Sequence, residues 1–386
     1  MTQPLIQLDH HATTPCDPRV VEVMAPYWTE LAANASSISH RPGLQAKEAV
    51  EQARQTIANC LGCTPREIVF TSGATEANNL AIKGVMVDAP ASAGLIVNAA
   101  EHKAVLDPAQ ELKRRGRAVH VLPVDAAARV QPQQIQANLT DETRLVSVML
   151  ANNEVGSLHD VASIAELCHD KGTPLHTDAT QAIGRVPVNL NELPVDMLSC
   201  SSHKIYGPPG IGLLFVRRSP RTPRLTPLFH GGGHEWGMRS GTLPLPLIVG
   251  FAKAMELAVS HQADDAARLS QQRDRLWNEL VRKIPGVVRN TPETDVLPNN
   301  LNITIPNIDG DVLFARLKAS RLCVSSGSAC TSANPEPSHV LRAMGLTDQQ
   351  ARASIRFGLG RYTTDEELRE AVEIVVRAWG ANGRLS

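Results

Sequence analysis

The sequence predicts an α/β protein whose main β-sheet is mostly parallel. Between about residues 65 and 216, short β-branched or apolar runs alternate with helical patterns. Strands separated by helices in this way are typical of βα units, which build parallel sheets flanked by helices. A second, shorter series of strands and helices follows Pro285-Gly286 and predicts a smaller α/β unit. The 386 residues are enough for two domains or for one large domain.

Local patterns predict each element of the larger unit. The expected strands are 68–70, 95–97, 145–149, 174–178 and 211–216, of which the last could run antiparallel to the others. Helices are expected after Gly73, from about Lys103, and around Ile164. A long helical region is expected from Leu245 to Lys283, where Pro285-Gly286 ends it.

The smaller unit is expected to contain, in order, a strand at 301–303, a helix at 312–317, a strand at 354–357 and a helix at 365–379. We predict a large domain over residues 15–260. The small domain would comprise 1–14 and 261–386 and would carry a mobile loop at about 324–336.

The composition argues against several classes of function. Charged residues make up 20% of the chain and the net charge is −1, so no surface for polyanions is indicated. Aromatic residues make up 3%, which argues against base-stacking nucleic-acid modules. Residues 1–7 show no secretion signal, and no apolar run reaches the roughly eighteen residues of a membrane span. We expect a soluble, cytoplasmic protein that binds neither nucleic acid nor membranes.

The seven cysteines are odd in number and widely scattered, which argues against a disulfide framework. Cys60 and Cys63 match C-x-x-C, the spacing of some zinc sites. They also lie at the end of a predicted helix, with Gly62 as its C-cap and Pro65 just beyond. No second C-x-x-C or histidine partner is evident, so we favour the helix end and expect no metal.

Cys330 stands apart from the other cysteines because only Ser, Gly, Ala, Thr and Asn surround it in 325–334. Such small residues cannot pack a core, where a cysteine behaves as a small hydrophobe among larger ones. Serine and glycine are typical of a mobile loop. The sequence therefore predicts a reactive sulfur that can move.

Lys204 follows the apolar stretch 196–200 and precedes a Gly-Pro-Pro-Gly turn. Most lysines are solvated surface charges, which is the alternative here. Hydroxyls at Ser201 and Ser202 and the adjacent His203 favour a site instead. A partly buried lysine has a lowered amine pKa and can form a Schiff base.

Other polar residues also follow predicted strands. Gly73-Ala74-Thr75 opens a helix, whose free N–H groups favour an anion, unless Ser72 or Thr75 simply caps that helix. Asp178 ends a strand, where its carboxylate could pair with the nitrogen of a pyridine ring or could be a helix N-cap.

Three further side chains suit a planar, anionic ligand. His102 follows a strand and could stack on a ring or move protons, although most of the 13 histidines are expected to be structural or exposed. Asn153 is a similar strand-end amide, suited to a ring hydroxyl. Arg356 alternates with apolar residues and needs an anionic partner, either a substrate carboxylate or an internal salt bridge.

Nine motifs in order make the chain resemble the cysteine desulfurases of the NifS/IscS type, within the class V aminotransferase group of fold-type I enzymes. They are L-D-H-H-A-T-T-P (8–15), T-S-G-A-T-E (71–76), E-H-K (101–103), N-N-E (152–154), D-A-T-Q (178–181), S-H-K-I-Y-G-P (202–208), H-G-G-G-H-E (230–235), R-S-G-T (239–242) and S-S-G-S-A-C-T-S (325–332).

The resemblance implies pyridoxal 5′-phosphate (PLP), bound as a Schiff base on Lys204. Asp178 would pair with the pyridine nitrogen, and His102 would stack on the ring. The remaining implied contacts are Asn153 and Gln181 to the ring hydroxyl, and Ala74, Thr75, Ser201 and His203 to the phosphate. Thr242 would reach the phosphate of a neighbouring subunit, which implies a homodimer. Arg356 and Asn34 would bind the carboxylate of L-cysteine, and Asn153 would also contact the substrate.

The implied reaction converts L-cysteine to L-alanine. Lys204 would remove the α-proton, and Cys330, deprotonated by His102 or by the substrate, would attack the substrate sulfur. The persulfide on Cys330 would pass to acceptor proteins such as an iron–sulfur scaffold. The chain ends before the C-terminal segment with which housekeeping relatives dock that scaffold, so we expect docking to differ. A selenocysteine lyase, another class V PLP enzyme and a non-catalytic sulfur carrier remain alternatives.

Overall fold

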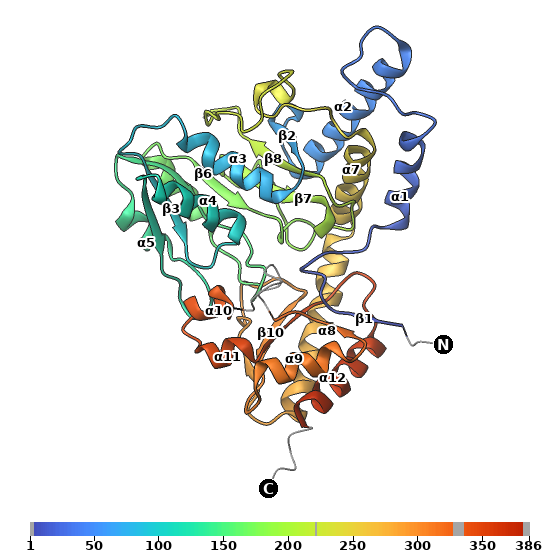
Figure 1. Ribbon diagram of the computed structural model, residues 1–386, viewed down its shortest axis with the longest axis vertical. Helices are drawn as coiled ribbons and strands as arrows, with labels where there is room; N and C mark the ends of the chain where they lie inside the picture. The colour runs from blue at the N-terminus through green and yellow to red at the C-terminus, as the bar shows by residue number, and fades with distance from the viewer. Residues whose placement is uncertain (1–3, 221, 327–335, 381–386) are drawn as a thin grey trace.

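The computed structural model describes residues 4–220, 222–326 and 336–380. Figure 1 shows a large sheet with its helices in the upper part of the view and a smaller group of C-terminal elements below it. The two groups have separate apolar cores. One contains residues such as Phe70, Phe215 and Phe251, and the other contains Leu276, Phe357 and similar residues. The domain division at about residue 260 remains our proposal, and these separate cores support it.

The large sheet has seven strands. Their spatial order is β2 (Ile68–Thr71), β8 (Gly212–Val216), β7 (Met197–Ser201), β6 (Leu175–Asp178), β5 (Thr143–Ser147), β3 (Gly94–Asn98) and β4 (Ala118–Leu122). Among these strands β8 alone runs against its neighbours, pairing antiparallel with β2 and β7, and the other pairs are parallel. The prediction of a mostly parallel sheet with a late antiparallel strand is confirmed. The edge strand β4 was not predicted, although Ala-Val-His-Val-Leu is apolar at four of its five positions; at the sheet edge, four of the five residues are not buried.

Helices cover both faces of this sheet. They are α1 (Pro18–Met24), α2 (Arg41–Leu61), α3 (Ala74–Met86), α4 (Lys103–Arg114), α5 (Pro132–Asn138), α6 (Val161–Asp170) and α7 (Leu245–Ser260). Successive strand residues point to opposite faces. Accordingly Val69 and Leu214 pack with α3 and α4, whereas Phe70 and Phe215 pack with α2 and α7. Burial on both faces explains why the strands read as continuous apolar runs.

The region from Leu245 to Lys283 consists of two helices rather than one. α7 ends at Ser260, and α8 (Gln262–Lys283) begins after His261, which leaves helical geometry. The ring Nδ1 of His261 lies 2.9 Å from the carbonyl oxygen of Leu257 and 3.0 Å from the hydroxyl of Ser260. These side-chain contacts compete with the helical pattern, so apolar periodicity alone could not reveal the break.

The smaller unit has two short sheets. β10 (Asn300–Thr304) lies between β9 (Val288–Arg289) and β12 (Ser354–Gly358), and β1 (Ile6–Gln7) pairs in parallel with β11 (Leu322–Cys323). Its helices are α8, α9 (Gly310–Lys318), α10 (His339–Ala343), α11 (Asp348–Arg352) and α12 (Asp365–Gly380). The strands and helices expected near 301, 312, 354 and 365 are therefore present.

Two smaller expectations can also be compared with the structure. Gly62 is the C-cap of α2 in the left-handed conformation, with φ of 69°, so Cys60 and Cys63 lie at a helix end as predicted. Within the described ranges, no helix is both long and apolar enough to span a bilayer.

Candidate active site

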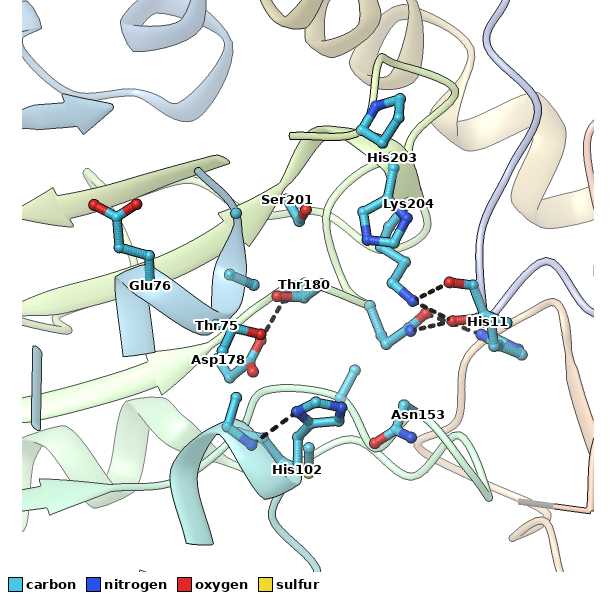
Figure 2. Close-up of a pocket in the computed structure, with 18 of the residues that line it drawn as sticks. His11, Thr75, Glu76, His102, Asn153, Asp178, Thr180, Ser201, His203 and Lys204 are labelled. Carbon is cyan, nitrogen blue, oxygen red and sulfur yellow. Dashed lines mark hydrogen bonds between the residues drawn. The ribbon is translucent and has the colours of Figure 1, made fainter. Parts of the chain in front are cut away.

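A cavity of about 470 Å³ lies at the carboxyl ends of the parallel strands (Figure 2). Its polar lining follows β2, β3, β5, β6 and β7, because strand ends in a parallel sheet share one edge, where such sheets bind ligands. The sequence-predicted residues that line it are Ala74, Thr75, His102, Asn153, Asp178, Gln181, Ser201, His203, Lys204 and Arg356. The fold therefore brings most of the predicted site together.

Lys204 is held by the N-terminal segment. Its Nζ donates to the carbonyl oxygens of His11 and Ala12, at 2.6 Å in each case. The segment is fixed beside the lysine because the backbone N–H and the hydroxyl of Thr14 both donate to the carbonyl of His203, at 2.9 Å. Sequence reasoning missed His11 and Ala12. The one feature of the sequence that could have pointed to His11 and Ala12 is that both lie within the motif at 8–15.

The helix α3 presents an open N-terminus to the cavity. It begins at Ala74 directly after β2, and its N-cap Gly73 has no side chain that could accept from the first turn. The alternative in which Ser72 or Thr75 caps the helix is not what the structure has. The N–H groups of the first turn are therefore available to an anion such as a phosphate.

The carboxylate of Asp178 is fixed by two neutral donors. Its Oδ2 accepts from Nδ2 of Asn78 at 2.7 Å, and its Oδ1 accepts from the backbone N–H of Thr180 at 2.9 Å. No helix of the described chain begins at Asp178, so its role is not that of an N-cap. The buried carboxylate faces the cavity, where it can pair with a protonated ring nitrogen.

His102 is the N-cap of α4. Its Nδ1 accepts from the backbone N–H of Ala104 at 3.1 Å, so the proton of the neutral ring is on Nε2. Burial lowers the pKa of His102 below its usual 6.5, which keeps the imidazole neutral at neutral pH. Figure 2 shows the His102 ring on the opposite side of the pocket from Lys204.

Gln181 lines the cavity but is also engaged by the N-terminal segment. Its Nε2 donates to the carbonyl of His11 at 3.0 Å, and its Oε1 lies 2.9 Å from Nδ1 of His11. Burial lowers the pKa of His11 well below its usual value. The neutral ring of His11 therefore donates from Nδ1 to Gln181, which fixes both side chains.

Arg356 has an internal anionic partner. Its buried guanidinium donates from Nη2 to Oδ1 of Asp9 at 2.8 Å and from Nη1 to the carbonyl of Asn153 at 3.0 Å. The salt bridge foreseen as an alternative is thus present, yet Arg356 still lines the cavity. Its Nε has no partner among the described residues.

Three predicted residues are not placed in this pocket. Asn34 is exposed, and its Oδ1 accepts from the backbone N–H of Ser36 at 2.9 Å. Thr242 is exposed outside the cavity of this single chain. Cys330 lies outside the described residues.

The pocket offers the chemical groups that PLP requires. Lys204 supplies an amine for an imine bond, Asp178 a carboxylate for the pyridine nitrogen, and α3 an uncapped N-terminus for the phosphate. This constellation at the strand ends of an α/β sheet defines a PLP-dependent enzyme of fold type I. The chain belongs to the aminotransferase class-V family, whose family model matches residues 6–370.

Similar proteins narrow this class. The "Cysteine desulfurase IscS" of Proteus mirabilis (strain HI4320) is 49% identical over 384 residues, covering 99% of this chain and 94% of the relative. A solved "NifS-like protein" superposes with a TM-score of 0.89 at 36% identity, covering 96% of this chain and 98% of its own. A structure described as "SspA in complex with cysteine" gives a TM-score of 0.80 at 35% identity, covering 92% and 99%. The resemblance predicted from the nine motifs is confirmed.

Proposed function

We propose that the chain is a cysteine desulfurase, which converts L-cysteine to L-alanine in this pocket. The observation that carries the proposal is that Lys204, Asp178 and His102 line one cavity. The full-length similarity to cysteine desulfurases and the cysteine held by the SspA structure support the choice of substrate. A selenocysteine lyase remains the second candidate among PLP enzymes.

PLP bound here supplies an electron sink for negative charge at the α-carbon of the substrate. Lys204 takes the α-proton, and the carbonyls of His11 and Ala12 keep its amine at the cavity wall. His102 exchanges protons through Nε2, because Nδ1 is engaged by the backbone of α4. Arg356 orients the substrate carboxylate.

Cys330 completes the reaction in this proposal. Its thiolate attacks the sulfur of cysteine, so an S–S bond forms as the Cβ–S bond breaks. The electron pair of the broken bond passes to the carbon, which takes a proton and becomes the methyl group of alanine. The products are alanine and a persulfide on Cys330, and no external oxidant or reductant is consumed.

Three further parts of the proposal rest on the family resemblance. The persulfide sulfur passes to an acceptor protein such as an iron–sulfur scaffold. Two chains form a homodimer in which Thr242 of one chain reaches the phosphate held by the other. The enzyme acts in the cytoplasm.

Mass spectrometry after brief exposure to L-cysteine tests the function. Trypsin leaves Cys323 and Cys330 in one peptide, between Arg321 and Arg342, so fragment ions must locate the added sulfur. We expect the mass of one sulfur atom on Cys330 and none on Cys323. Alanine production without that addition would favour the lyase. In parallel, borohydride reduction should attach PLP to the peptide that contains Lys204, and attachment elsewhere would refute the assignment.

A further inference from the structure

We propose that Asn78 is a positioning residue, which aims the carboxylate of Asp178 at the pyridine nitrogen of PLP. The inference rests on the assignment of the pocket to PLP, but it does not depend on which amino acid is the substrate. Neither the motifs nor the family resemblance pointed to this residue.

Contact and burial carry the inference. Asn78 is fully buried on α3, and its Nδ2 donates to Oδ2 of Asp178 at 2.7 Å. A carboxylate oxygen can only accept, so the amide nitrogen must face it. The amide Oδ1 has no partner among the described residues. An unpaired buried polar atom costs free energy, and the buried neighbours on α3 such as Ala77 and Ala81 are apolar. A purely structural position would favour an apolar residue here.

Asp178 shares the pocket with the amine of Lys204, and the other titratable groups near it are Glu101, His176 and His102. Burial raises the pKa of nearby Glu101 well above its usual value, which favours the neutral form of that side chain. Burial lowers the pKa of His176 to about 4, and it also lowers that of His102, so neither ring supplies a positive charge at neutral pH. The hydrogen bonds from the neutral donors Asn78 and Thr180 reach both oxygens of the Asp178 carboxylate and stabilise it directly.

The place of Asn78 on α3 also joins two parts of the cofactor site. It follows Ala74 by about one helical turn, or roughly 6 Å along the axis. The first turn of the same helix is open to the phosphate. One rigid helix thus sets both the phosphate position and the direction of the carboxylate that receives the ring.

Titration of the apoproteins with PLP, in the absence of cysteine, tests the inference. A hydrogen bond to a charged group corresponds to a change of roughly tenfold to hundredfold in a dissociation constant. We therefore expect Asn78→Ala to weaken PLP binding by at least about tenfold. Asn78→Asp should weaken it further, because it places a second carboxylate beside Asp178. Asn79→Ala is the matched control: Nδ2 of Asn79 donates to the carbonyl of Thr75 and not to Asp178, so binding should be unchanged.

A second measurement separates positioning from simple loss of structure. Both alanine variants are also followed by thermal unfolding without PLP and by the pH at which the visible absorbance of the Schiff base changes. Positioning by Asn78 should shift that pH in Asn78→Ala, and the small donor of Asn78→Ser should restore part of the shift. If Asn78→Ala lost only thermal stability and kept both the affinity and the titration of the wild type, the inference would be wrong. A wild-type chain that bound no PLP would instead refute the proposed function.

Discussion

The guanidinium of Arg356 donates to the carboxylate of Asp9 across a distance of 2.8 Å. The two residues are 347 positions apart in the chain, and β12 and the N-terminal segment bring them together. Arginine has five N–H donors. Two of these donors bond to Asp9 and to the carbonyl of Asn153. These two bonds orient the planar guanidinium of Arg356 and leave its other donors for a substrate carboxylate.

Arg356→Lys should raise the KM for L-cysteine by about tenfold or more and leave the PLP content unchanged. Lysine keeps the positive charge, but it cannot contact Asp9, Asn153 and a substrate carboxylate as a planar fork does. Steady-state kinetics and the visible absorbance of the purified variant measure the two effects. Arg369→Lys, at an exposed position on α12, is the control. An unaltered KM in Arg356→Lys would rule out a role in substrate binding.

Cys330→Ala should abolish sulfide release from L-cysteine and keep the cofactor absorbance, since the pocket that binds PLP is built from other residues. A sulfide assay with a reductant, together with an absorbance spectrum, measures both. Cys323→Ala, the control in the neighbouring β11, should retain activity. Turnover that survived the loss of Cys330 would favour a lyase.

Glu154→Gln should change how stability depends on pH. Burial raises the pKa of Glu154 from 4.5 to about 7, and the hydroxyl of Ser338 donates to its carboxyl group. A raised folded-state pKa stabilises the fold fully below about pH 4.5, and the stabilisation disappears as the pH approaches 7. At roughly 1.4 kcal/mol per pH unit, the wild type should lose up to about 3 kcal/mol across this range that the variant keeps.

Urea unfolding of both proteins at several pH values measures this difference. Glu166→Gln, an exposed substitution on α6, should follow the wild-type profile. Parallel profiles for the wild type and Glu154→Gln would show that folding does not raise the pKa of this carboxyl group.

Glu235→Ala should lower the free energy of unfolding by about 3–5 kcal/mol, as expected when one partner of a buried ion pair is removed. Glu235 accepts from Arg54 at 2.7 Å and from the backbone N–H of Phe70 at 2.7 Å, and both charged side chains are buried. Denaturant titration measures the loss. Glu51 is an exposed partner of the same arginine, so Glu51→Ala should cost less than about 1 kcal/mol. Equal losses in the two variants would contradict this ranking.

The site residues that the sequence could predict are those that lie at the ends of strands. Asp178 and Lys204 follow apolar runs, and parallel strands share one carboxyl edge, so adjacency along the chain implied adjacency in space. Asn78 could not be predicted in this way. Its partner Asp178 lies on another element, and the apolar residues around Asn78 in the sequence predict only that α3 is buried. Likewise, no local pattern could decide between a substrate and Asp9 as the partner of Arg356, since that contact depends on how the termini meet.

The segment that holds Lys204 also governs the order in which the molecule can be assembled. Within residues 6–14, β1 pairs with β11, Asp9 forms a β-bridge to Gly358, and Thr14 donates to the carbonyl of His203. These partners are synthesised about 190 to 350 residues after the segment itself. Contacts so distant in sequence close late in folding. A nascent chain can therefore complete its large sheet while the pocket is unfinished, and catalytic competence waits for β12 to emerge.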